Sequence, residues 1–299
     1  MDPMKIIDAH QHFWDLQTCD LPWLTSNENI PFRYGDYSAI KKDFLVADYR
    51  ACTANHNIVN TVHMEAEWNP VDPVAESRWL TKLSQAQGLP GAFVAQAWLD
   101  RDDVEDVLAG HAAFPLVRGI RQKPKAAPTP DDYVPNMPGS MMDPKFREGY
   151  ALLQEHGLSY DLQIPWWHLH EAAELATDFP ATQIIVNHTG LPSDRSEAGL
   201  NGWRNAIKVA AMLPNIAIKI SGIGVKEQPW TVESNRQIVL DTIEVFGPDR
   251  CMFASNFPVD SVVADFDTIF NGFKTITKDF SDEDRNMMFH DNAVRIYRL

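Results

Sequence analysis

The stretch Ile7-Asp8-Ala9-His10-Gln11-His12-Phe13-Trp14 decides the fold of this chain. It is a short apolar run that ends in two histidines, as a buried strand would end. Because the side chains of a strand alternate between its two faces, His10 and His12 are expected on the same side. An open doubly wound sheet would usually carry a Gly-rich phosphate turn at this point. The stretch therefore favours a barrel, in which polar residues follow the strands.

Seven further β-branched runs follow, and each of the eight runs precedes a segment with helical periodicity. The expected strands are residues 5–10, 58–65, 91–99, 116–122, 158–164, 183–188, 216–221 and 251–257. The expected helices are 45–56, 73–87, 104–113, 144–156, 169–178, 203–213, 232–246, 264–277 and an extra one at 282–297. Strand–helix alternation implies parallel pairing with right-handed crossovers. The chain is thus predicted to be an α/β protein, one (β/α)8 TIM barrel domain over residues 1–299.

Two long irregular stretches follow the first and the fourth expected strands. They are residues 18–43 and 123–143, and the second contains five prolines, so it is an extended loop. Both leave the carboxyl end of a strand, where a barrel places its active site. We expect them to form walls or lids of a pocket, the alternative being surface insertions.

Charge and composition exclude several classes of function. The net charge is −15 over 299 residues, which argues against nucleic-acid and anionic-membrane partners and leaves a small molecule as the expected one. The three cysteines form no Cys-x-x-Cys pair or disulfide framework, as in proteins of reducing compartments. No signal pattern or long apolar run is present. A cytoplasmic protein is expected, and a homo-oligomer is left open.

Polar residues recur at the carboxyl ends of the expected strands. They are His10 and His12; His63 and Glu65; Arg118 and Arg121; Asp161 and Gln163; Asn187 and His188; Lys219 and Ser221; Ser255 and Asn256. Charged groups are rarely buried in apolar strands without a partner or a purpose. Structural alternatives stand beside this interpretation: the arginines could pair with neighbouring acids, Lys219 could reach the rim, and His188 could be a hydrogen-bonded core residue.

Six motifs occur in the order of one known family. They are Asp-Ala-His-Gln-His-Phe-Trp, Val-Arg-Gly-Ile-Arg, Val-Asn-His-Thr-Gly, Lys-Ile-Ser-Gly, Ser-Asn-Phe-Pro-Val-Asp and the ending Asn-Ala-Val-Arg-Ile-Tyr-Arg-Leu. Together they resemble the amidohydrolase superfamily, in the branch of sugar-lactone hydrolases and 2-pyrone-4,6-dicarboxylate lactonase. The resemblance spans nearly the whole chain and implies a barrel that hydrolyses a small cyclic ester.

The resemblance also raises the possibility of a bound divalent metal. Many members hold one or two divalent metals on the strand-one histidine pair, on histidines after strands five and six, and on an aspartate after strand eight. This chain matches with His10, His12 and His188, which would be the ligands of a single metal, zinc above all. Strand five offers no histidine, and Asn256 stands at the aspartate position. Since metal-independent members also occur in this branch, both a metal and no cofactor remain open.

Asn256 also leaves the general base open, because an amide has no basic form at accessible pH. The candidates are Asp260, His188, Glu65 and Asp161. The favoured function is hydrolysis of a sugar aldonolactone in carbohydrate catabolism. The alternatives are a metal-dependent decarboxylase of an aromatic or dicarboxylic acid and a non-catalytic barrel that binds a sugar acid. The expected catalytic residues are His10, His12, Arg118, Arg121, His188, Asn256 and Asp260, and the expected substrate-binding residues are Trp14, Glu65, Asp161, Gln163, Trp166 and Lys219.

Overall fold

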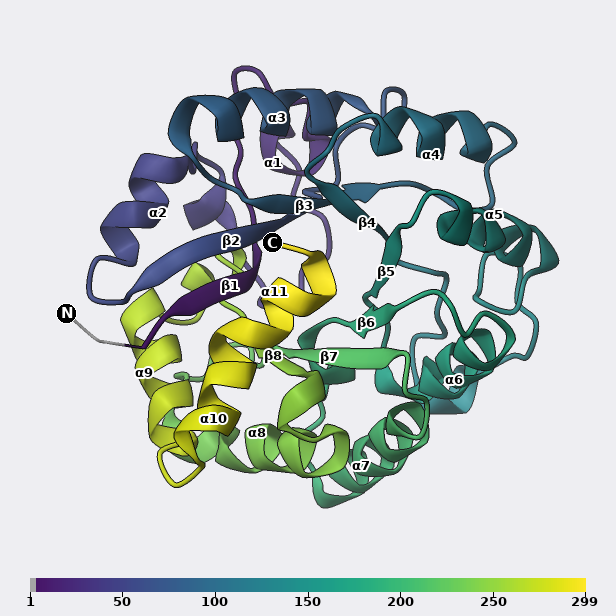
Figure 1. Ribbon diagram of the computed structural model, residues 1–299. Coiled ribbons are helices and arrows are strands. Elements are labelled where there is room, and N and C mark those ends of the chain that lie inside the picture. The colour runs from purple at the N-terminus through teal and green to yellow at the C-terminus, as the bar shows by residue number, and fades with distance from the viewer. Residues whose placement is uncertain (1–3) are drawn as a thin grey trace.

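The computed structural model describes residues 4–299 and shows eight parallel strands surrounded by helices (Figure 1). The strands are β1 (Ile6–Gln11), β2 (Ile58–Met64), β3 (Ala92–Gln96), β4 (Val117–Gln122), β5 (Ser159–Leu162), β6 (Ile184–Val186), β7 (Ile216–Ile220) and β8 (Cys251–Phe253). Each strand pairs with the next in the chain. After β8, the N–H of Asn256 donates to the carbonyl of His10 at 2.7 Å, which brings the first and last strands together. The predicted (β/α)8 barrel and all eight of its strands are confirmed.

The helices follow the expected order with three differences, the first being α1, a short helix inside the expected loop 18–43. They are α1 (Pro22–Thr25), α2 (Val46–Cys52), α3 (Ala75–Gln87), α4 (Val104–Ala112), α5 (Pro144–Glu155), α6 (Leu169–Asp178), α7 (Glu197–Ala211), α8 (Val232–Phe246), α9 (Phe266–Ile276), α10 (Asp282–Asn286) and α11 (Asn292–Tyr297). Helix α7 begins before residue 203, because Ser196 caps it by accepting from the N–H of Gly199. The expected helix 282–297 is divided by a π-helical segment at Met287–Asp291.

Apolar side chains fill the space inside the barrel and the space between strands and helices. Inside lie small and β-branched residues such as Ala9, Val94 and Ile185. Outside lie the aromatic residues, including Phe253 and Phe273, whose ring centroids are 4.7 Å apart. The size difference follows from the geometry, since an eight-stranded barrel leaves room for little more than its own side chains.

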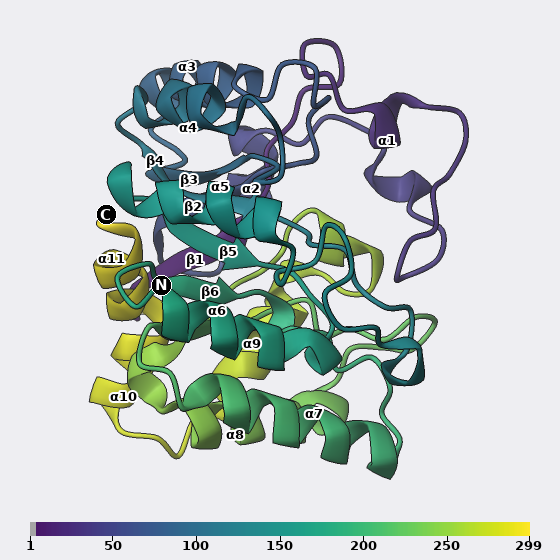
Figure 2. The same ribbon diagram turned by 90° about the vertical axis from the view of Figure 1, so that its right-hand side faces the viewer.

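The two ends of the barrel are covered differently. Helix α11 packs against the inner residues, and Arg298 beside it donates to the carbonyls of Arg118 and Gly157, near the amino ends of β4 and β5. Figure 2 shows α11 and α1 at opposite ends of the molecule. The carboxyl ends therefore face the long loops, of which 18–43 carries α1 and 123–143 carries a short 3-10 helix at Pro130–Asp132. None of the helices described over residues 4–299 is long and apolar enough to cross a bilayer.

Candidate active site

The end of β1 directs both histidines into the barrel. The register between β1 and β2 shifts between Asp8 and Gln11, as at a bulge. The rings of His10 and His12 lie 5.1 Å apart, and that of His10 lies 4.6 Å from His188, at the end of β6. Bulges commonly re-aim a side chain beside an active site. The structure thus brings together the three histidines that the sequence singles out.

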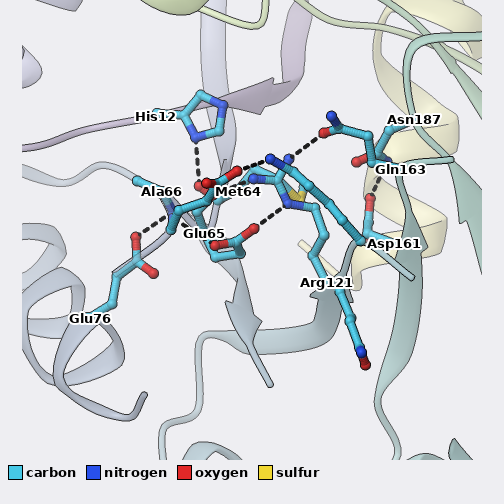
Figure 3. A network of polar contacts seen from close by, with 12 residues as sticks. His12, Met64, Glu65, Ala66, Glu76, Arg121, Asp161, Gln163 and Asn187 are labelled. Atoms are coloured by element: carbon cyan, nitrogen blue, oxygen red, sulfur yellow. Dashed lines mark hydrogen bonds and ion pairs between the residues drawn. The ribbon is translucent and has the colours of Figure 1, made fainter. Parts of the chain in front are cut away.

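The protonation of His12 follows from its partners. Its Nδ1 lies 2.8 Å from the carbonyl oxygen of Met64, which can only accept, so Nδ1 carries the proton (Figure 3). Burial, reinforced by the charge of Arg121, holds the pKa of His12 well below its usual range. The ring is therefore neutral near pH 7, and its Nε2 carries a free lone pair.

Asn256 faces that lone pair with its own acceptor. The amide Oδ1 lies 3.3 Å from Nε2 of His12, while the amide Nδ2 donates to Oδ1 of Asp260 at 2.7 Å. Because the carboxylate takes the N–H, the Asn256 oxygen must face the histidine. Two acceptors side by side cannot bond each other, so they are arranged for a shared donor such as water.

Asp260 supports Asn256 from behind. Its carboxylate also accepts from the hydroxyl of Tyr34 at 3.1 Å and lies 3.4 Å from the guanidinium of Arg33. Burial raises the pKa of Asp260, and Arg33 opposes the shift. The side chain is buried and fully engaged, so it orients the amide and does not face the cavity.

The chain after β6 adopts an unusual backbone. His188 and Thr189 have φ values of 54° and 52°, in the left-handed region that side chains disfavour. Nδ1 of His188 lies 2.9 Å from the hydroxyl of Ser221. A Cβ at Gly222 would meet Nδ1 of His188 at 2.5 Å, so only glycine fits there. Strained backbone that the surroundings hold in place is typical of functional sites.

Arg121 presents a fixed positive charge at the same end of the barrel. Its Nε donates to the Glu65 carboxylate and its Nη2 to the Glu65 carbonyl, both at 2.6 Å, and its Nη1 donates to Gln163 at 3.2 Å (Figure 3). The guanidinium is held by a two-point contact, which fixes its orientation as well as its position.

These side chains surround a cavity of about 310 Å³. Its lining includes His12, Trp14, Arg121, Gln163, His188 and Asn256. The ring of Trp14 lies 6.1 Å from that of His12, and its Nε1 donates to the carbonyl of Lys42 at 2.7 Å. The cavity thus combines a neutral imidazole base, a fixed cation and an aromatic wall.

His10 lies behind this cavity with unpaired ring nitrogens. Both nitrogens are buried and have no hydrogen-bond partner among residues 4–299. Buried polar atoms are almost always paired, so the two free nitrogens set His10 apart from the hydrogen-bonded polar residues around it.

Two expected substrate-binding residues lie deeper in the barrel. Asp161 and Lys219 form a fully buried ion pair with 2.7 Å between Oδ1 and Nζ, and Tyr297 of α11 donates to the same carboxylate at 3.0 Å. Neither residue lines the cavity. Each stands two residues before the inward position that reaches the strand end, so the structure places both in the layer beneath the cavity.

Arg118 and Trp166 are also not part of the group. Arg118 lies at the start of β4, near the end of the strand opposite to Arg121, and donates to the carbonyl of Pro115. Because the two arginines are three residues apart, their side chains point to opposite faces of the strand. Trp166 lies in a short 3-10 helix with its ring against Gly202 of α7. Neither residue contributes to the cavity wall, so the structure does not bring Arg118 and Trp166 together with the other predicted site residues.

Known proteins resemble this chain both in sequence and in fold. The family model described as Amidohydrolase matches residues 7–299. The chain belongs to the amidohydrolase family. A hydrolytic enzyme, as predicted from the sequence, is thereby confirmed.

Three similar proteins place this amidohydrolase within its family. "Uncharacterized protein y4mH" of Sinorhizobium fredii is 42% identical over the full length of both chains. An L-fucono-1,5-lactonase of Burkholderia multivorans is 23% identical over 98% of this chain and 96% of its own. The crystal structure of an amidohydrolase from Burkholderia multivorans with bound zinc is 21% identical, with a TM-score of 0.80 over 98% of this chain and 99% of that one. This likeness shows a shared fold.

Amidohydrolase family members commonly bind a divalent metal, for which His10, His12 and His188 are the candidate ligands in this chain. No group of three or more His, Cys, Asp or Glu side chains among residues 4–299 is arranged to hold a metal ion. Asn256 and Gln163 supply amides where carboxylate or imidazole ligands would complete a set, and amides are weaker ligands for zinc. His10, His12 and His188 are the side chains that would hold a metal, and the described residues around them do not complete the ligand set of a zinc site.

Sequence reasoning missed two basic residues of the cavity. Arg33, from the loop after β1, and Lys123, directly after β4, both line it. Lys123 forms an ion pair with Glu67. The position of Lys123 at a strand end was a usable signal. Arg33 lies in a loop without periodicity, and only the folded chain brings it beside Asp260.

Proposed function

We propose that this amidohydrolase opens a small lactone, a sugar aldonolactone. One observation carries the proposal: a neutral His12 directs a free lone pair at the cavity that also holds the fixed Arg121 guanidinium. Ester hydrolysis needs a base for the attacking water and a positive group for the developing oxyanion. The L-fucono-1,5-lactonase relative supports the same reaction class.

The reaction is derived from the chain's own side chains. Water donates one hydrogen to Nε2 of His12 and the other to Oδ1 of Asn256, which places its oxygen over the lactone carbonyl. His12 takes a proton as the water attacks, and Arg121 stabilises the charge that forms on the carbonyl oxygen. The ring C–O bond then breaks, and the leaving oxygen takes the proton that His12 gained from the water, which returns His12 to its neutral form. His188, whose Nδ1 lies 2.9 Å from the hydroxyl of Ser221, can donate a hydrogen bond from Nε2 to that oxygen. The product is the open hydroxy acid.

The stereochemistry of the substrate is left to experiment. The test is a pH-indicator assay of purified protein against a panel of fucono-, rhamnono- and galactono-lactones, with and without chelator. We expect turnover of at least one lactone in both conditions. Loss of turnover with chelator and recovery with zinc would contradict the metal-free steps, and no turnover of any lactone would overturn the proposed function.

Variants connect that assay to the site. His12→Ala should lower kcat by about 1000-fold, within the usual range for a lost acid–base group, and His188→Ala by at least about 100-fold, as for a lost hydrogen-bond donor to developing charge. His290→Ala is the matched control, because its ring lies on the surface beside Asp291. Wild-type kinetics in His12→Ala would remove that residue from the reaction.

A further inference from the structure

A second, larger cavity adjoins the catalytic one. It has a volume of about 1150 Å³ and lies over the carboxyl ends of β2 to β4. We call it the outer groove. The two cavities share Trp23, Ile30, Pro31, Glu67, Arg121 and Lys123 in their walls. The groove is therefore continuous with the place where the lactone ring would bind, and the catalytic steps proposed above do not use it.

Three tryptophans line the outer groove. Trp23 donates from Nε1 to the carbonyl of Ala66 at 2.8 Å, which fixes its ring. Trp68 is nearly buried, whereas Trp98 is 45% exposed although it is a large apolar side chain. Aromatic faces of this kind stack on the C–H faces of sugar rings, and an exposed tryptophan at a groove signals a ligand.

The charged residues of the groove favour a neutral polyhydroxyl ligand. Arg121 and Lys123 each form an ion pair, with Glu65 and Glu67, so neither adds an unpaired positive charge to the groove. Glu28, Asp100 and Asp143 add carboxylates to the wall, with Lys125 as a further cation. Carboxylates accept hydrogen bonds from hydroxyl groups but repel anions. An anionic extension of the substrate is therefore disfavoured.

The loop wall of the groove is held in place before any ligand arrives. Within 123–143, the N–H of Ala127 donates to Nε2 of His168 at 2.8 Å, and its carbonyl accepts from Trp167 at 3.0 Å. The hydroxyl of Tyr133 lies 2.9 Å from His170. These contacts tie the loop to the start of α6, so little ordering is needed on binding.

We infer that the outer groove binds a second sugar ring, so that the substrate class is an aldonolactone bearing a glycosyl group. The lactone ring occupies the cavity of His12 and Arg121, and the glycosyl ring lies in the groove over Trp98. This assignment rests on the lactonase activity proposed above. It adds a subsite that discriminates between substrates by size.

The test pairs each parent aldonolactone that the enzyme hydrolyses with its glycosylated derivative, as glucono-lactone pairs with lactobiono- and melibiono-lactone. We expect kcat/KM to be at least about tenfold higher for a glycosylated member. Trp98→Ala should remove about five- to tenfold of that preference, as expected for one aromatic stacking contact, and leave the parent lactone within twofold. Trp98→Phe keeps an aromatic face and should retain most of it.

The outcomes separate the two proposals. Hydrolysis of parent lactones with no gain from any glycosyl group, and no effect of Trp98→Ala, would overturn the second subsite and leave the lactonase intact. No hydrolysis of either kind would overturn the lactonase. Unchanged parent kinetics in Trp98→Ala show that the variant is folded, so a selective loss reports on the groove alone.

Discussion

The carboxyl-end layer of the barrel and the layer beneath it are both polar, but their polar atoms are used differently. In the lower layer, the Asp161 carboxylate is bonded by Lys219, Asn187 and Tyr297, and every charge has a partner. In the upper layer, the Nε2 of His12 faces another acceptor, and both nitrogens of His10 have no partner among the described residues. The two layers therefore differ in how their polar atoms are satisfied: the charges of the lower layer are paired with each other, whereas the upper layer keeps acceptors free for water or substrate.

The sharpest test of this contrast uses the two arginines of β4. Arg121→Lys should lower kcat/KM about 100- to 1000-fold, because lysine keeps the charge but loses the two-point contact with Glu65 that aims it. Arg118→Lys, on the same strand, should stay within twofold. Steady-state kinetics on the best lactone measure both. A comparable loss in the two variants would break the distinction between the layers.

The lower layer should respond in stability and not in turnover. Lys219→Met leaves the buried Asp161 carboxylate without its cation and should lower the free energy of unfolding by about 3–4 kcal/mol, measured by urea denaturation. Lys219→Met combined with Asp161→Asn should recover much of that loss. A stable Lys219→Met protein without turnover would instead place Lys219 in the catalytic layer.

Acid should destabilise the protein through histidines that are buried and neutral. Burial lowers the pKa of His111 to about 4 from an ordinary value of 6.5, and its nitrogens are engaged by Ser77 and by the carbonyl of Gln96. Between these pH values His111 binds a proton in the unfolded chain but not in the folded chain. The free energy of unfolding therefore falls as the pH decreases from 6.5 to 4. The His111 share is up to about 3 kcal/mol.

His111→Gln isolates that share, because glutamine does not titrate. The free energy of unfolding, measured at pH 7, 5.5 and 4.5, should fall less steeply in the variant than in the wild type. Turnover at pH 7 should stay within about twofold, since a histidine with both nitrogens engaged resembles the lower layer and not the site. Parallel pH curves would show that His111 does not carry the effect.

The smallest effect is expected from two tyrosine hydroxyls. Tyr297→Phe removes a donor to Asp161 and should cost about 1–2 kcal/mol with unchanged kinetics. Tyr150→Phe is the matched control, because its buried hydroxyl has no partner among residues 4–299. That variant should be neutral or slightly stabilising. An equal loss of unfolding free energy in the two variants would show that the hydrogen bond to Asp161 is not the cause of the Tyr297→Phe effect.

Local pattern was sufficient for the elements of the fold. Most strands are short apolar runs rich in β-branched residues, and polar residues stand at or directly after their ends, so all eight could be predicted from neighbours in the sequence. The start of α7 was missed because glycines at 199 and 202 weaken the helical signal, while the Ser196 cap restores it. Helical periodicity also did not predict the π-helical segment at Met287–Asp291.

The membership of the site was predictable only in part. Strand ends gave His10, His12, Arg121, His188 and Asn256, which the fold brings together. Alternation along β4 would have separated Arg118 from Arg121, since residues three apart point to opposite faces. Asp161 and Lys219 do point inward, and only the packing of α11 shows that Tyr297 completes their layer.

The sequence by itself determined the barrel, its family motifs and the paired histidines, because these depend on residues close together in the chain. The tertiary structure decided which polar atoms stay unpaired. The hydrogen bond from His12 to Met64, the Asn256–Asp260 contact and the continuity of the two cavities all join segments far apart in the sequence. Hydrogen-bond satisfaction depends on such distant partners, which no local pattern encodes.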